Sequence, residues 1–219
     1  KRLTDNRSPE TSSAWSPDSS RIAYVSDSPP DLKGTAHRSL HVMNADASDD
    51  IRLTSGASDI APAWSPNGSR IAFARLVSGG GVSAGDIYVV NTDGSGLKQL
   101  TDGPGDDNGP TWSPDGSKIV FESGRLGNWD VFIMNADGSD QLGLSNHLFD
   151  DVWPSWGPEG ERIAWARRSG LDGHVYVINV DGTGERRIND VRLPVMTPSW
   201  SPDGRRVVFA SIGLQIYAV

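Results

Sequence analysis

The chain alternates short apolar stretches with clusters of turn-forming residues, and this pattern occurs five times. Each apolar stretch is four or five residues long and begins with a basic residue, at residues 21–25, 70–74, 118–121, 162–165 and 206–209. Their length, and their content of Ile, Val, Phe and Tyr, predict β-strands. The hydrophobic pattern therefore indicates an all-β chain.

A tryptophan precedes each of these strands in one short motif, which reads Trp-Ser-Pro-Asp-Gly in its most regular copies. The five tryptophans are 49, 48, 44 and 44 residues apart, and they are Trp15, Trp64, Trp112, Trp156 and Trp200. Proline lacks the N–H that a strand ladder needs, and Asp-Gly supplies the positive φ of a tight turn. The motif therefore predicts that a first strand ends here and turns into a second. One tryptophan at the same strand position in every copy predicts a core between neighbouring units.

Each copy continues with a third strand, a second turn and a short fourth strand, at residues 86–91, 92–96 and 99–101 of the second copy. Four short strands in 44 to 49 residues match one blade of a β-propeller. We therefore expect an all-β fold over residues 1–219, a single five-bladed β-propeller domain with four-stranded antiparallel blades. The expected blades cover approximately residues 5–54, 55–101, 102–145, 146–189, and 190–219 plus 1–4.

The two ends of the sequence predict how such a ring closes. Arg2-Leu3-Thr4 repeats the fourth-strand motif of Arg52-Leu53-Thr54, and residues 214–219 correspond to a third strand. We expect the N-terminal strand to complete the last blade and so to cover a strand edge that would otherwise favour aggregation. A five-repeat piece of a larger ring is the alternative that the sequence leaves open.

The order Trp-Ser-Pro-Asp-Gly, Ile-Ala-Phe, Asn-x-Asp-Gly and Leu-Thr resembles the repeat of TolB-like propellers, in which Pro-Asp takes the place of the Trp-Asp of WD40 repeats. The resemblance covers essentially the whole chain. It says less about function, because similar repeats form propeller domains of oligopeptidases and of some polysaccharide lyases. It implies an extracytoplasmic bacterial setting, periplasmic or secreted, a protein or peptide partner, and calcium in the central channel.

Composition narrows the classes of partner. The chain has 28 acidic and 20 basic residues, and this net charge of -8 disfavours nucleic acid and anionic membrane surfaces. Cationic partners fit the overall charge better. No run of 18 apolar residues is present, so we expect no membrane insertion. The absence of cysteine excludes disulfides, thiolate metal sites and cysteine nucleophiles, and the sequence does not indicate an oligomeric state.

An acidic residue stands five positions before four of the five tryptophans, and the fifth copy has Val195 there. The members of this acidic register are Glu10, Asp59, Asp107 and Asp151. If the first strand of each blade is innermost, these carboxylates approach the channel and repel one another unless they are neutralised. Two alternatives stay open: the register binds a hard cation such as Ca²⁺, or its members cap the preceding turns by accepting backbone N–H groups.

The loops between second and third strands vary most, and long ones are expected at residues 27–39 and 76–85. Variation on one face of a rigid scaffold is typical of a binding surface. The aromatic and arginine residues expected near this face, outside the repeat positions, are Trp129, Trp153, Phe149, Arg125 and Arg167. Tryptophan and arginine are favoured at protein interfaces, so these are candidate partner-binding residues, with packing between blades as the alternative for the tryptophans.

The four histidines, His37, His41, His147 and His174, show no metal-ligand spacing, and no Gly-x-Ser-x-Gly or zincin motif is present. We therefore expect no catalytic residues and no bound cofactor other than the possible channel Ca²⁺. The sequence predicts a non-enzymatic protein- or peptide-binding or scaffolding propeller. The alternative is a carbohydrate-binding or carbohydrate-active propeller. In such a protein, carboxylates on one face would serve as acid and base, and exposed aromatic rings would stack against the sugar.

Overall fold

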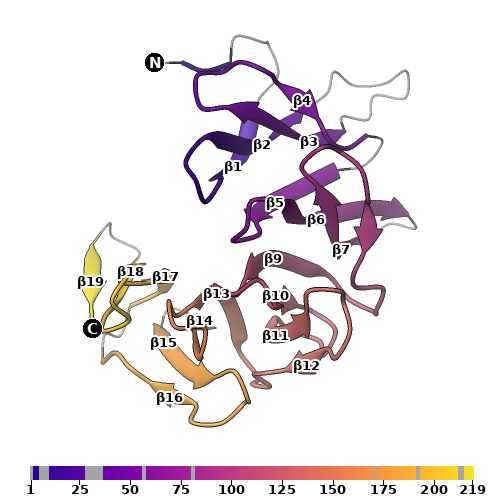
Figure 1. Ribbon diagram of the computed structural model, residues 1–219. Helices are drawn as coiled ribbons and strands as arrows, with labels where there is room; N and C mark the ends of the chain where they lie inside the picture. Colours follow the sequence, from indigo (N-terminus) through magenta and orange to yellow (C-terminus); the bar gives the residue numbers. More distant parts are fainter. Residues whose placement is uncertain are drawn as a thin grey trace. The chain divides into compact units, whose positions relative to one another are not determined.

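The computed structural model describes residues 2–4, 10–27, 37–55, 58–79, 82–170, 172–190, 193–211 and 215–219, apart from the side chains of 77–79 and 82–84. The described residues form nineteen β-strands and no helix, so none of them forms an apolar helix that could cross a membrane (Figure 1). The chain divides into two compact units, Lys1–Asp102 with Asp106–Pro110, and Gly103–Gly105 with Thr111–Val219. Each unit is described by itself.

The first unit contains two four-stranded antiparallel sheets, each ordered as in the sequence. Blade 1 consists of β1 (Glu10–Trp15), β2 (Arg21–Asp27), β3 (Arg38–Asn44) and β4 (Ile51–Arg52). Blade 2 consists of β5 (Ser58–Trp64), β6 (Arg70–Gly79), β7 (Val82–Asn91) and β8 (Lys98–Gln99). The predicted four-stranded blades are confirmed here.

The second unit continues the pattern. Blade 3 consists of β9 (Asp107–Trp112), within which the division of the chain falls, β10 (Lys118–Ser123), β11 (Asp130–Asn135) and β12 (Leu142–Gly143). Blade 4 consists of β13 (Asp150–Trp156), β14 (Arg162–Ser169), β15 (Asp172–Asn179) and β16 (Arg186–Arg187). Blade 5 consists of β17 (Val195–Trp200), β18 (Val207–Ser211) and β19 (Ile216–Ala218). Because the two units are not placed relative to each other, closure of the ring by residues 1–4 stays a prediction.

Within each unit, the repeated tryptophan joins a blade to the one before it, whereas Trp15 of blade 1 is 58 % exposed in the first unit. The indole Nε1–H donates to the backbone carbonyl that precedes the previous blade's tryptophan, from Trp64 to Ala14 at 3.1 Å and from Trp200 to Ser155 at 3.2 Å. Trp156 donates to Thr111 in the same way at 3.1 Å. A buried indole N–H needs such an acceptor, so one residue provides both apolar packing and a hydrogen bond.

The basic residue that begins the second strand strengthens the same junction in each unit. The guanidinium carbon of Arg21 lies 5.0 Å from the centroid of the Trp64 ring, and its Nη2 donates to the Gly68 carbonyl at 3.1 Å. Arg162 makes the equivalent contact with Trp200 at 4.7 Å. A guanidinium over an indole face is a favourable cation–π arrangement. The predicted junction between blades thus adds to its apolar core a tryptophan, an arginine and the carbonyl of the turn glycine.

Every first strand contains one residue with a left-handed backbone. The positive φ values are 51° at Ser12, 52° at Ala61, 57° at Gly109, 56° at Trp153 and 45° at Thr197. In β1, β5, β13 and β17 the pairing register shifts at this position, which identifies a β-bulge. This position holds a small residue or threonine in four blades and tryptophan in blade 4.

The structure corrects one of the two predicted long loops. Residues 76–85 were expected to form a loop, but β6 and β7 extend through them and pair as far as Gly79 with Val82. Pairing satisfies backbone groups that a loop would leave to water, and the β-branched valines in this segment favour it. Residues 80–81 and residues 28–36 of the other expected loop lie outside the described residues.

Candidate functional site

The acidic register is largely buried, and two of its members are neutralised by arginine. Arg75 donates to both oxygens of Asp59, from Nε at 2.7 Å and from Nη2 at 3.0 Å. Arg167 does the same to Asp151, with both distances at 2.7 Å. Each arginine is the cross-strand partner of its aspartate. These fork-shaped pairs join the first strand of a blade to the second.

These contacts bear on the calcium that the family resemblance implies. Both carboxylate oxygens of Asp59 and Asp151 already accept hydrogen bonds from a guanidinium, whose fixed positive charge would repel Ca²⁺. Across the described part of the chain, no three His, Asp or Glu side chains are grouped so that they could hold a metal ion. Asp59 and Asp151 therefore do not fit a hard-cation site, and a metal role for Glu10 and Asp107 stays a prediction.

The register lies where the fourth strand of one blade passes into the first strand of the next. Leu40 donates its backbone N–H to the Thr54 hydroxyl at 2.9 Å, and that hydroxyl donates to Asp59. The equivalent acceptors in blades 2, 3 and 4 are Thr101, Ser145 and Asn189. The network connects a third strand, a fourth strand and the next first strand, which gives the register a structural role.

Residues 2–4 occupy the corresponding place in front of blade 1. Thr4 donates to Glu10, as Thr54 does to Asp59. Leu3 packs against the blade 1 core of Ile22, Tyr24 and Met43. Thr4 therefore stands before blade 1 as Thr54 stands before blade 2, and pairing of residues 2–4 with the last blade stays a prediction.

Two of the candidate partner-binding residues are already engaged within the second unit. Arg167 is only 7 % exposed, binds Glu185 at 2.9 Å as well as its aspartate, and lies 4.2 Å from the Tyr176 ring centroid. Arg125 lies 4.6 Å from the Phe132 ring centroid and donates to Gln141 at 2.8 Å. Both side chains contribute to packing in the structure, which their place in the sequence did not indicate.

Phe149 belongs to an exposed apolar loop that precedes β13. Phe149 is 46 % exposed and its neighbour Leu148 is 92 % exposed. Phe149 donates its backbone N–H to His147 Nδ1 at 3.2 Å, and its carbonyl accepts the Asn128 side-chain amide at 3.0 Å. The loop is therefore fastened to the blade 3 loop that carries Asn128. Leu148 was missed because only aromatic and arginine residues were considered.

Trp129 and Trp153 lie beside this loop and pack against one apolar cluster that includes Val152 and Val195. Trp129 donates its backbone N–H to Asp150 at 3.2 Å. Both indoles are half-buried. Each ring therefore takes part in packing within the unit and keeps part of its surface in solvent, and a partner-binding role for either stays a prediction.

Two buried carboxyl groups lie at the same end of blade 3. Burial raises the pKa of Glu122, although its Oε1 accepts the Trp153 N–H at 2.7 Å. Burial also raises the pKa of Asp130, and the nearby negative charge of Asp151 adds to this effect. An isolated acid in an apolar repeat position is the signal that could have identified Glu122 from sequence.

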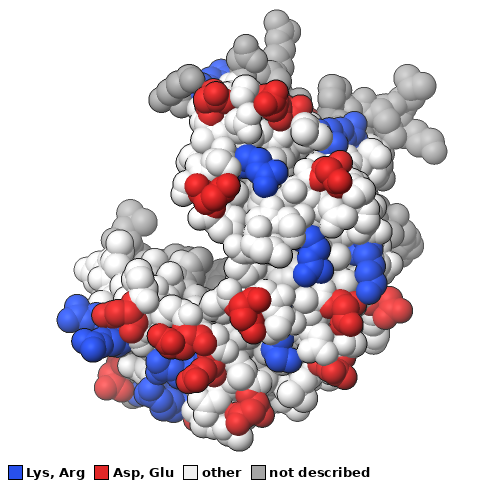
Figure 2. All heavy atoms as spheres, viewed as in Figure 1, with Lys and Arg blue, Asp and Glu red and all other residues white. Residues whose placement is uncertain are grey.

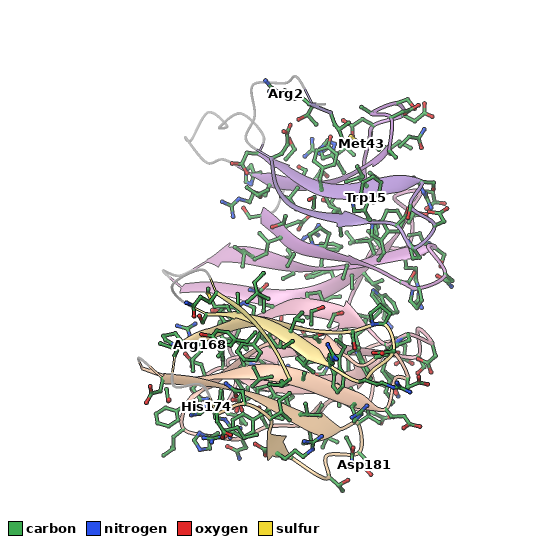
Figure 3. The ribbon with its side chains drawn as sticks, turned by 90° about the vertical axis from the view of Figure 1, so that its left-hand side faces the viewer. Arg2, Trp15, Met43, Arg168, His174 and Asp181 are labelled. Atoms are coloured by element: carbon green, nitrogen blue, oxygen red, sulfur yellow. The ribbon has the colours of Figure 1, made fainter. Side chains whose placement is uncertain are left out.

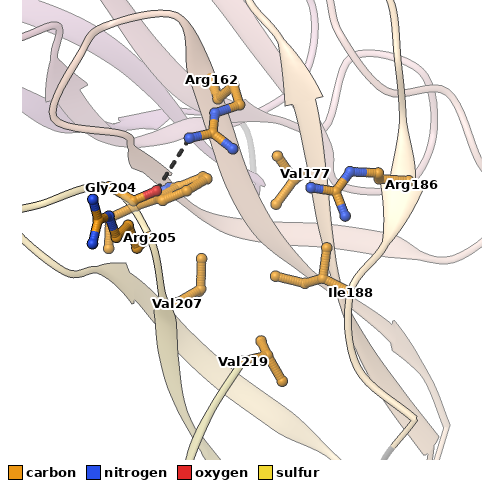
Figure 4. Close-up of a pocket in the computed structure, with 9 residues that line it drawn as sticks. Arg162, Val177, Arg186, Ile188, Gly204, Arg205, Val207 and Val219 are labelled. Carbon is orange, nitrogen blue, oxygen red and sulfur yellow. Dashed lines mark hydrogen bonds between the residues drawn. The ribbon is translucent and has the colours of Figure 1, made fainter.

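A pocket of about 190 Å³ lies between blades 4 and 5 (Figure 4). Three guanidinium groups stand over its apolar floor, those of Arg162, Arg186 and Arg205. The floor residues Val177, Ile188 and Val207 occupy the positions that Val42, Leu53 and Ile71 fill in the core of the first unit. The pocket therefore belongs to the packing between blades.

Elsewhere on the visible surface, acidic and basic side chains are interleaved (Figure 2).

Comparison with known proteins agrees with the repeat. A family model described as the TolB beta propeller domain matches residues 1–176. The chain belongs to this family. TolB from Acinetobacter baumannii superposes with a TM-score of 0.72 at 23 % identity, over 95 % of this chain and 50 % of that one. This chain thus spans half the length of that relative.

Two further solved structures show that the fold serves different functions. An oligogalacturonate lyase in complex with manganese has a TM-score of 0.76 at 13 % identity, over 95 % of this chain and 60 % of its own. A chain of a nidogen/laminin complex has a TM-score of 0.71 at 11 % identity, over 96 % of this chain and 75 % of its own. No curated protein matches the sequence. At these identities the likeness concerns the fold alone.

Proposed function

We propose that this chain is a non-enzymatic propeller that binds a protein or peptide partner at the loop-bearing end of blades 3 and 4. The observation that carries this proposal is the exposure of Leu148 and Phe149 on a loop that hydrogen bonds hold in place. Large apolar side chains on a soluble surface favour burial by a partner. A loop that is already fixed loses little conformational entropy when it binds.

Family membership supports this proposal in general terms. TolB-like propellers imply a protein partner and an extracytoplasmic setting, and we propose the same setting for this chain. The nidogen/laminin structure is a complex of two proteins, and one of its chains has this fold. The lyase shows that the same architecture also carries enzymes, so the proposal rests on the loop and not on the fold.

A panning experiment tests the proposal directly. A display library of random linear peptides is selected on the immobilised protein, and one enriched peptide is synthesised for affinity measurement. We expect the double variant Leu148→Ser/Phe149→Ser to bind this peptide at least tenfold more weakly. The matched control is Leu142→Ser, which removes another exposed leucine of the second unit, 50 % exposed on β12.

Two outcomes would contradict the proposal. One is unchanged peptide affinity in the Leu148→Ser/Phe149→Ser variant. The other is the absence of enriched peptides together with binding to an oligosaccharide array, which would favour the carbohydrate alternative.

A further inference from the structure

Three residues of blades 3 and 4 depart from the repeat and meet at one place. The fourth residue after the basic residue that begins the second strand is small and apolar in four blades, and it is Glu122 in blade 3. Its equivalents are Val25, Ala74, Ala166 and Ala210. The bulge position of the first strand holds Trp153 in blade 4, where the other blades have Ser12, Ala61, Gly109 and Thr197. The third residue is Arg168, near the end of β14.

These residues contact one another. The Trp153 N–H donates to Glu122 Oε1 at 2.7 Å, and the Arg168 guanidinium carbon lies 5.7 Å from the Trp153 ring centroid. A bulky side chain at a φ of 56° is disfavoured, because its Cβ crowds the backbone in the left-handed region. Strain of this kind is concentrated at functional sites. The other blades form the same bulge without a tryptophan, so the bulge itself does not require one.

Arg168 is a free cation within the part of the molecule that the structure describes. Its side chain is exposed, and beyond its contact with the Trp153 ring it makes no hydrogen bond or ion pair there. Its cross-strand neighbour Asp150 is engaged by the Trp129 N–H and does not pair with it. Its positive charge acts on the buried Glu122 carboxyl group, whose pKa it lowers against the larger, raising effect of burial. Figure 3 shows Arg168 toward one end of the strands of this unit and Asp181 toward the other.

We propose that Arg168 and Trp153 bind a carboxylate and the adjoining apolar group of a peptide partner. A guanidinium matches a carboxylate with two parallel hydrogen bonds, and an aromatic face beside it covers the neighbouring aliphatic or aromatic group. The site is continuous with the exposed loop, because Phe149 immediately precedes the strand that carries Trp153. This inference rests on the proposed peptide-binding function and states which chemistry the partner presents there.

The overall charge limits the kind of partner segment. A chain with a net charge of -8 repels runs of acidic residues at long range. A single Asp or Glu side chain, or a terminal carboxylate, within an otherwise apolar segment avoids most of that repulsion. The site is therefore assigned to an apolar peptide that carries one carboxylate.

The same random peptide library, panned on the parent, Arg168→Gln and Trp153→Gly proteins, tests this assignment. The parent is expected to enrich peptides with one acidic residue beside an apolar one. A synthetic peptide chosen from these should bind each variant at least tenfold more weakly. Changing the acidic residue of this peptide to the amide should weaken its binding to the parent by the same factor. The amide peptide should bind Arg168→Gln no more weakly than the acidic peptide does. The control is Arg205→Gln, which makes the same charge change at another exposed arginine of this unit.

Thermal melting of Trp153→Gly separates binding from packing. Gly109 occupies the same position in blade 3, so relief of the positive φ offsets part of the packing that the indole makes against Val152, and this variant should melt close to the parent while it loses the peptide. A lower melting temperature together with unchanged affinity would show that Trp153 only packs, and would overturn the assignment.

The remaining outcomes separate this inference from the proposed function. Enriched peptides that lack a carboxylate but depend on Leu148 and Phe149 would overturn the inference and leave the proposed function standing. No enriched peptide on the parent would overturn both. Binding of acidic oligosaccharides that Arg168→Gln abolishes, without peptide binding, would replace the peptide with a sugar.

Discussion

The buried ion pair between Asp151 and Arg167 makes a quantitative prediction about stability. Replacing Asp151 by Asn leaves the Arg167 guanidinium, which is 7 % exposed, without its fork-shaped partner. Removing one partner of a buried pair costs about 3–5 kcal/mol of unfolding free energy. Glu185 still binds Arg167 at 2.9 Å, and the new amide can accept one hydrogen bond. We therefore expect a loss near the lower end, about 3 kcal/mol.

A double variant distinguishes the cost of an unpaired charge from the value of the pair. Blade 5 has Val195 at the position of Asp151 and Ser211 at that of Arg167, so this junction folds without an ion pair. Asp151→Val combined with Arg167→Met removes both charges and keeps most of the apolar volume. Replacement of a buried ion pair by apolar groups is often neutral, so the loss should be about 1 kcal/mol or less.

Urea denaturation followed by tryptophan fluorescence and circular dichroism measures both variants against the parent. Asp59→Asn in the first unit serves as an independent copy of the test, since Arg75 holds Asp59 in the same way. The reasoning is refuted if Asp151→Asn stays within about 1 kcal/mol of the parent. It is also refuted if the double variant is destabilised as much as the single one.

Four further perturbations follow from the repeat and its exceptions. Trp156→Phe should cost about 1 kcal/mol by removing the indole hydrogen bond to the previous blade, measured by denaturation. Closure of the ring predicts the same loss for Trp15→Phe, whereas no loss would count against closure. Burial raises the pKa of Glu122 in the folded protein above its ordinary value of 4.5, so the parent loses stability as the pH rises from 4.5 through the folded pKa. Glu122→Gln cannot ionise. This variant should therefore melt higher than the parent at neutral pH and at the same temperature near pH 4.5. A lower melting temperature at neutral pH would contradict this. Adding Ca²⁺ should leave the melting temperature unchanged. If Ca²⁺ raises the melting temperature and Asp107→Asn abolishes that rise, the acidic register binds a cation as the sequence predicts.

The blade architecture was predictable because the residues that build it recur in the same order every 44 to 49 residues. Proline and Asp-Gly mark the turns, and the tryptophan makes the same hydrogen bond in each described junction within a unit. The extension of β6 and β7 was not predictable in this way, since the glycines and serines of that segment are equally typical of a loop. Whether this segment forms strands or a loop depends on pairing between β6 and β7, which cannot be read from the residue types alone.

The candidate site was predictable only in part. Phe149 and Trp153 were identified by residue type, but residue type does not reveal that Trp153 has a positive φ. The ion pairs of the acidic register did leave a signal, because an arginine stands sixteen residues after the aspartate in blades 2 and 4. In blades 1 and 3 that position holds Ser26 and Ser123. A comparison of the blades with one another would have found this difference.

In a repeat protein each blade serves as a control for the others, because all of them meet the same folding requirements with the same kinds of residue. Other blades have Gly109 at the bulge and Ala166 at the strand position, so the fold requires neither the tryptophan nor the acid there. The positions that recur should therefore govern stability, and those that depart should govern binding. Variants of the two classes should separate accordingly, with tryptophans of the repeat affecting unfolding and Arg168 affecting affinity at nearly constant stability.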